Sequence, residues 1–131
     1  MKKIILLAFI LSLGFSVTAQ EQDYTFEQLE VQPEFKGGMS EFFKYIAKNM
    51  HYPADARNEG VQGKVLVQFV VTKTGEIDDN SIEVKQGLYP SLDEEAIRLI
   101  KECPDWIPGR ITKKGEAAPT RLVIPIHINL R

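Results

Sequence analysis

Apolar residues recur along this chain with two different periods. Between positions 39 and 50 they recur every three or four residues, which predicts one apolar face of an α-helix; its members are Met39, Phe43, Ile46 and Met50. In residues 64–72 and 121–130 they occupy every second position, which predicts two half-buried β-strands. The pattern therefore predicts a domain that mixes helices and strands.

Turn and cap residues predict the remaining elements. Pro53 ends the first helix and can open a short second one over 54–57. Gly75 suits a hairpin turn between the strand 64–72 and a return strand over 77–85, which is weakest at 78–80. A third helix runs from about 92 until Pro104 stops it. Two serines are candidate helix caps: Ser40, and Ser91 in a capping box with Glu94.

The order helix, helix, strand, strand, helix, strand predicts an α+β fold. The helices are expected to pack on one face of a small three-stranded antiparallel sheet. This domain is predicted to cover residues 33–131. A polar, acidic stretch over 20–32 is expected to be a short leader with little structure.

The N-terminus has the pattern of a signal peptide. Lys2 and Lys3 precede an apolar run over 4–17, and a small residue, Ala19, ends the segment. The run is shorter than the roughly 20 residues of a membrane span. Residues 1–19 are therefore predicted to be cleaved during export. The alternative is an uncleaved anchor in the inner membrane.

Composition excludes several classes of function. A net charge of −2 argues against a nucleic-acid partner. One cysteine and two histidines are too few for a disulfide framework or a His/Cys zinc site. The acidic pairs at 78–79 and 93–95 fit a hairpin and a helix start. The composition and motifs thus predict no catalytic residue and no metal site.

The stretch Glu102-Cys103-Pro104-Asp105-Trp106-Ile107-Pro108-Gly109 holds the only tryptophan and the only cysteine. Cys103 has no nearby base and falls on the apolar stripe of the third helix, so we interpret it as a small buried hydrophobic residue. Trp106 between two prolines is interpreted as a structural wedge, and a ligand-stacking ring is the alternative.

An ordered set of motifs spans about residues 33–130. The set consists of Pro33-x-Phe35-x-Gly37-Gly38, Tyr52-Pro53-x-x-Ala56, Glu59-Gly60-x-x-Gly63, the strand from Val65 to Val71, Gly75, Leu92-Asp93-x-Glu95-Ala96-x-Arg98, Trp106-x-Pro108-Gly109 and Pro125-Ile126. This set resembles the TonB C-terminal domain family, in the energy-transducer form common in Bacteroidetes-type bacteria. Lys36 stands where that form more often has proline.

The resemblance implies a periplasmic, non-enzymatic domain without a cofactor, linked to transmembrane transport. It implies a partner, the TonB box of outer-membrane TonB-dependent receptors, which adds as a strand beside the last strand of the domain. Tyr52 matches the Tyr-Pro of the family, and Asn49 stands near a polar position that contacts the receptor segment. A homodimer is a further possibility.

The chain departs from full transducers. The resemblance implies a retained membrane helix and a long Pro-rich spacer, whereas here we expect a cleaved signal and a short leader. Energy transduction is therefore open. The alternative function is a periplasmic adaptor or structural module that neither binds receptors nor transduces energy.

Pro125 predicts which edge of the last strand is free. Proline lacks an N–H, so it fits a strand where its nitrogen points away from the paired neighbour. Backbone groups of alternate residues point to the same side, which puts Val123, His127 and Asn129 on that open edge as well. We expect a partner segment to pair there. The alternative is an edge that Pro125 merely protects.

The signal-peptide interpretation predicts that the mature protein begins at or near Gln20 and fractionates with soluble periplasmic proteins. N-terminal sequencing of the fractionated protein checks this. An intact Met1 in the inner membrane would contradict cleavage and favour the anchored alternative.

Overall fold

The computed structural model describes residues 23–130. The predicted signal peptide, residues 1–19, lies outside this range. Within the range, no helix is long and apolar enough to cross a membrane. The elements, in chain order, are β1 (Tyr24–Thr25), the 3-10 helix η1 (Phe26–Gln28), β2 (Glu34–Phe35), α2 (Met39–Asn49), α3 (Ala54–Asn58), β3 (Gly63–Val71), the 3-10 helix η2 (Asp79–Ser81), β4 (Glu83–Gln86), α4 (Pro90–Lys101), β5 (Trp106–Ile107), β6 (Gly109–Arg110), β7 (Ala117–Ala118) and β8 (Thr120–Ile128).

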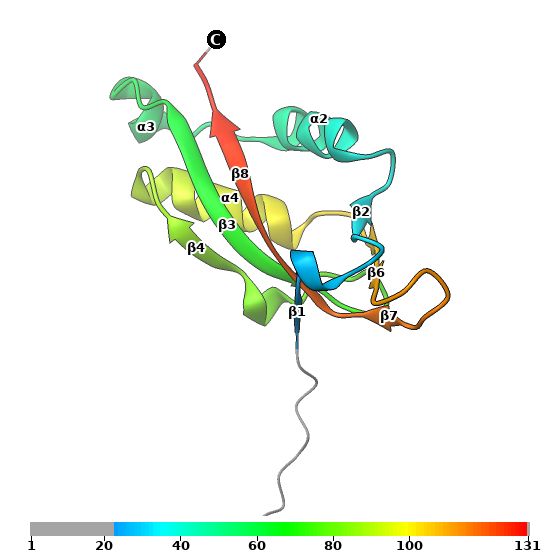
Figure 1. The fold of residues 1–131 in the computed structure, drawn as a ribbon. Helices are drawn as coiled ribbons and strands as arrows, with labels where there is room; N and C mark the ends of the chain where they lie inside the picture. The colour runs from blue at the N-terminus through cyan, green and yellow to red at the C-terminus, as the bar shows by residue number, and fades with distance from the viewer. Residues whose placement is uncertain (1–22, 131) are drawn as a thin grey trace, which may run out of the picture.

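The main sheet has the strand order β1-β8-β3-β4 (Figure 1). Strands β8 and β3 pair antiparallel in a continuous register from Gly63 opposite Ile128 to Val71 opposite Thr120. Strand β4 is antiparallel to β3, whereas β1 is short and parallel to β8. The predicted α+β fold with three antiparallel strands is confirmed, and β1 adds a fourth strand.

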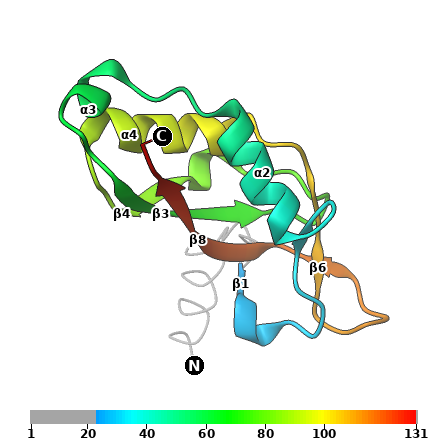
Figure 2. The same ribbon diagram turned by 90° about the horizontal axis from the view of Figure 1, so that it is seen from above.

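Helices α2 and α4 lie on the same side of this sheet (Figure 2). Every second residue of β3 and β8 faces them. Val65, Val67 and Phe69 are fully buried on β3, and they pair with buried Ile126, Ile124 and Leu122 on β8. Residues directly opposite each other in an antiparallel pair share a face, so the two alternating patterns merge into one core.

Trp106 is the centre of an aromatic cluster within this core. Its ring centroid lies 5.6 Å from that of Phe35, 5.3 Å from Phe42 and 5.7 Å from Phe69. Only 4% of the residue is exposed. The four rings come from β2, α2, β3 and β5, so the cluster joins four separate segments. The interpretation of Trp106 as a structural wedge is confirmed.

The turn predicted at Gly75 packs directly on this tryptophan. The backbone N–H of Trp106 donates to the backbone carbonyl of Gly75 at 2.7 Å. Gly75 has φ of 92°, and a Cβ there would lie 2.0 Å from the Trp106 carbonyl oxygen. Glycine is therefore required both by its backbone conformation and by the close approach of β5.

Both predicted serine caps were wrong. Helix α4 begins at Pro90 with Tyr89 as N-cap, and the Ser91 hydroxyl instead donates to Asp55 Oδ1 at 2.6 Å. Asp93 Oδ1 accepts a hydrogen bond from the Leu88 N–H at 2.9 Å, so Asp93 satisfies a backbone donor just before the start of α4. Ser40 lies inside α2, whose N-cap is a glycine.

The apolar faces of two helices also differ from prediction. On α2 the buried aromatic residue is Phe42, whereas Phe43 and Met39 are 38% and 41% exposed. Helix α4 ends at Lys101, so Cys103 lies in the following turn. It is half-buried against the core, and burial raises the pKa of its thiol to about 11.

Residues 23–32, expected to form a leader with little structure, pack on the domain instead. The Tyr24 N–H donates to the Pro119 carbonyl at 2.9 Å, and Asp23 forms an ion pair with Arg121 at 2.9 Å. Leu29 is buried, and Val31 forms a β-bridge with Arg110. These contacts are distant in sequence and carry no periodic pattern, which is why the sequence did not reveal them.

We expect Trp106→Ala to lower the free energy of unfolding by about 3–5 kcal/mol, the usual cost of removing a large buried aromatic ring. Urea unfolding followed by circular dichroism measures the loss. Ile107→Ala is the matched control, because its neighbouring side chain is 48% exposed and should change stability by about 0.5 kcal/mol or less. Equal losses in both variants would contradict the central role of the ring.

Candidate functional site

One side of β8 is paired with β3 along its whole length, whereas the other side is largely free. Among the described residues, only β1 pairs with that second side, and it reaches only Thr120 and Arg121. From Leu122 to Ile128 the strand therefore has an open edge. Figure 1 shows β8 beside β3, with β1 at its N-terminal end.

The backbone of Val70 establishes which residues point toward this edge. Its N–H donates to Ser81 Oγ at 2.8 Å and its carbonyl accepts from Asp78 N–H at 3.0 Å, both on the side of β3 away from β8. Val70 lies opposite Arg121, so the Arg121 backbone also points away from the pair. The bond from Tyr24 to the Pro119 carbonyl agrees with this alternation.

The same alternation directs the backbone groups of Val123, Pro125 and His127 to the open edge. Pro125 lies opposite Leu66, so its missing N–H removes no bond between β8 and β3. This is the orientation expected from Pro125. Strand β8 ends at Ile128, two residues earlier than predicted, so Asn129 follows the strand as an exposed residue.

A groove of about 780 Å³ lies between α2 and the C-terminal part of β8; we call it the α2 groove. Phe43 and His127 both line it and pack edge to face, with ring centroids 6.4 Å apart. The groove brings together three of the predicted site residues, Tyr52, His127 and Asn129. Its full lining is Phe43, Ile46, Ala47, Met50, Tyr52, Arg57, His127, Asn129 and Leu130.

Two contacts fix Tyr52 in the wall of the α2 groove. Its hydroxyl donates a short hydrogen bond to the Val61 carbonyl. The Arg57 guanidinium stacks over its ring at 5.6 Å, which is within the range of a cation–π interaction. The groove therefore combines an apolar helix wall with one cationic and several aromatic groups, a surface suited to binding.

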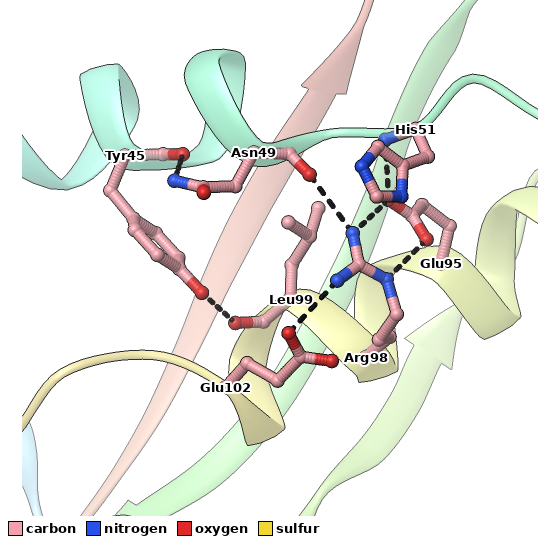
Figure 3. Close-up of polar contacts among 7 residues, drawn as sticks. All are labelled: Tyr45, Asn49, His51, Glu95, Arg98, Leu99 and Glu102. Atoms are coloured by element: carbon pink, nitrogen blue, oxygen red, sulfur yellow. Dashed lines mark hydrogen bonds and ion pairs between the residues drawn. The ribbon is translucent and has the colours of Figure 1, made fainter.

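Asn49 lines neither this groove nor a second one at Val123, described below. Its side-chain amide donates to the Tyr45 carbonyl at 2.8 Å, and its own carbonyl accepts from Arg98 Nη2 at 2.9 Å (Figure 3). Asn49 thus contributes to the junction of α2 and α4. Its contact with a partner stays a prediction.

That junction depends on a half-buried ion pair (Figure 3). Arg98 holds Glu95 through two bonds, of 2.7 Å from Nε and 2.6 Å from Nη2. Glu95 Oε2 also accepts the His51 N–H at 2.7 Å. The pair therefore fixes the chain between α2 and α3, where Tyr52 lies, against α4.

Burial raises the pKa of Glu95, but the hydrogen bonds from Arg98 and from the His51 backbone outweigh it and hold this pKa below its usual value. A depressed carboxyl pKa adds stability above the pKa of the unfolded chain, about 4.3. That stability is lost as the pH falls through the lower, folded-state pKa.

We expect Glu95→Gln to lose about 1.5–3 kcal/mol of unfolding free energy at pH 7, the range for hydrogen bonds to charged groups. The difference from wild type should shrink when unfolding is measured at successively lower pH, because the native carboxylate becomes protonated as the pH falls through its lowered pKa. Glu102→Gln is the control: its carboxylate contacts the same arginine but is 62% exposed, so the loss should be below about 1 kcal/mol. A pH-independent difference for Glu95→Gln would contradict the assignment.

The sequence did not reveal part of this site. Ala47 and Arg57 were not expected to line a groove, and Phe43 was expected in the core. The Glu95–Arg98 pair had a usable signal, since opposite charges three residues apart lie on one helix face. Within residues 23–130, no group of three or more His, Cys, Asp or Glu side chains is placed to hold a metal.

Comparisons with known proteins give a likeness of fold and a match to a family model. The structure resembles two solution structures of the TonB C-terminal domain of Helicobacter pylori, each 24% identical in sequence over 71% of this chain. The TM-scores are 0.52 for residues 194–285, with 94% of that chain covered, and 0.51 for residues 179–285, with 80% covered. No curated protein sequence gives a significant match.

These structures establish the likeness of fold. The family model described as the Gram-negative bacterial TonB protein C-terminal matches residues 48–130, which is more than half of the sequence. The match covers α3, the paired strands β3 and β8, and α4. The chain therefore belongs to the TonB C-terminal domain family.

Proposed function

We propose that this protein is a periplasmic TonB-like domain that binds the TonB box of outer-membrane TonB-dependent receptors by strand addition at β8. Membership of a family of non-catalytic domains with a role in transport supports this proposal. In this proposal the partner is a receptor segment, and the protein is periplasmic after cleavage of residues 1–19.

The observation that carries the proposal is the outward orientation of the backbone at Val123, Pro125 and His127. An edge with unpaired N–H and C=O groups is a template for another extended segment. Val123 and His127 each offer a donor and an acceptor, and Pro125 offers an acceptor. An extended segment of about six residues, at about 3.3 Å per residue, would match the free edge from Val123 to Ile128.

The α2 groove supplies the side-chain part of recognition. It lies beside the edge at His127, so a paired segment would place alternate side chains against Phe43, Ile46 and Tyr52. Main-chain hydrogen bonds then supply the affinity, and the groove supplies a preference for particular side chains of the segment. Asn49 is an exposed residue at the C-terminal end of α2, and we propose that it contacts the partner segment outside the groove.

We expect His127→Pro to weaken binding of a TonB-box peptide about tenfold, since it removes an edge donor and strains the neighbouring bonds. The fold should survive because no bond to β3 uses that N–H. Fluorescence anisotropy with the purified protein measures affinity, and thermal melting checks the fold. His127→Thr keeps the N–H and is the matched control. An equal loss in both variants would assign the effect to the imidazole instead.

Amide chemical-shift mapping locates the bound peptide. The proposal requires shifts at Val123, His127 and Asn129. Shifts confined to the outer surface of α4, with none along the β8 edge, would reject strand addition and favour an adaptor that uses its helices.

A further inference from the structure

The open edge of β8 is bordered by a second groove at its N-terminal end. This η1 groove has a volume of about 580 Å³. The apolar part of its lining includes Phe26 of η1, Met39 at the start of α2, Pro33, Trp106, and Val123 and Pro125 of β8. It is therefore a largely apolar space that opens on the edge itself.

The N-terminal segment builds this groove. The β1 pairing with Thr120 and Arg121, and the Asp23–Arg121 ion pair, hold η1 beside Val123. Phe26, Pro33 and Met39 all precede residue 48, where the match to the family model begins. The groove therefore joins these three residues to Trp106 and to residues of β8, which lie within the matched range.

Exposed apolar side chains gather here. Phe26, Met39 and Val123 are 49%, 41% and 51% exposed, and all three border the η1 groove. A single exposed apolar residue needs no explanation, but a contiguous group around a concavity marks an interaction site.

The edge determines what kind of molecule fits. Val123 and Pro125 belong both to the groove and to the free backbone edge, so an occupant paired with β8 must be an extended chain whose side chains alternate between two faces. One of these side chains then falls into the groove. Strand β1 blocks the edge at Arg121, so the paired segment cannot slide further toward the start of β8.

We infer that the η1 groove is a second subsite for the same partner segment and that it takes one bulky apolar side chain, such as phenylalanine or leucine, near the end of the segment that lies at Val123. This inference rests on the proposed strand addition. Because the stop at β1 fixes the register, the preference falls at one position of the segment.

A positional scan tests it. The probes are nine-residue labelled peptides of serine, threonine and valine that carry one phenylalanine, moved along the sequence, or alanine at the same position. One position near one end should bind about tenfold more tightly with phenylalanine than with alanine, as expected from burying an aromatic ring. Fluorescence anisotropy measures each peptide.

Two variants assign the gain to the groove. Phe26→Ser and Met39→Gln alter exposed side chains, so the melting temperature should change little. Each should abolish most of the gain from phenylalanine while binding of the alanine peptides persists. Ile111→Ser is the matched control, because this side chain is 41% exposed and borders neither groove.

The outcomes separate this inference from the proposed function. If the peptides bind and His127→Pro weakens them, but phenylalanine gives no gain that depends on Phe26 and Met39, the second subsite is overturned and strand addition stands. Light scattering of the free protein gives a further outcome. A wild-type dimer that becomes a monomer in Phe26→Ser would overturn the inference and would indicate that the groove binds a second copy of this chain. If no peptide binds, including those with alanine, strand addition fails and the subsite fails with it.

Discussion

The packing of Trp106 against three phenylalanines is the interaction on which the rest of the structure depends. It brings together β2, α2, β3 and β5, whose order in the sequence gives no reason for them to meet. Gly75 completes the arrangement, because only a residue without a Cβ lets the hairpin approach the Trp106 carbonyl. The aromatic packing holds α2 in a position where its exposed residues border β8. The same packing that stabilises the core therefore also shapes the grooves beside the β8 edge.

Helix α2 divides its apolar residues between two tasks. Phe42 and Ile46 are buried in the core, whereas Phe43 is 38% exposed and borders the α2 groove. The helix therefore has a wider apolar surface than its packing on the sheet requires. Full burial of a phenylalanine contributes about 1.5–3 kcal/mol. Phe43 forgoes the part of this that belongs to its exposed 38%, and another molecule that covers the ring would recover it. This is the physical basis for regarding the groove as a binding surface.

The sequence predicted the elements whose signal is periodic and missed those fixed by distant contacts. The alternation in β3 and β8 gave the strands and their buried faces, and Pro125 gave the direction of the backbone at the edge. Periodicity at α2 identified the right helix but could not tell Phe42 from Phe43, since these neighbours are about 100° apart on the helix and either one continues the apolar stripe through Ile46. The predicted cap at Ser91 was wrong because α4 begins one residue earlier, at Pro90, and the Ser91 hydroxyl donates to Asp55 instead. Strand β1 was missed because a two-residue strand has no period.

The free edge of β8 is limited in a way that favours one kind of partner. A long, flat edge invites aggregation, and proteins shorten or interrupt such edges. Here β1 closes the edge at Arg121, Pro125 removes one donor in the middle, and the strand ends at Ile128. A second copy of β8 would bring a second Pro125 to the pairing and so would lose two donors, whereas a segment without proline loses one. The edge therefore disfavours pairing with a second copy of β8, while it still offers donors at Val123 and His127 to an extended segment of another protein.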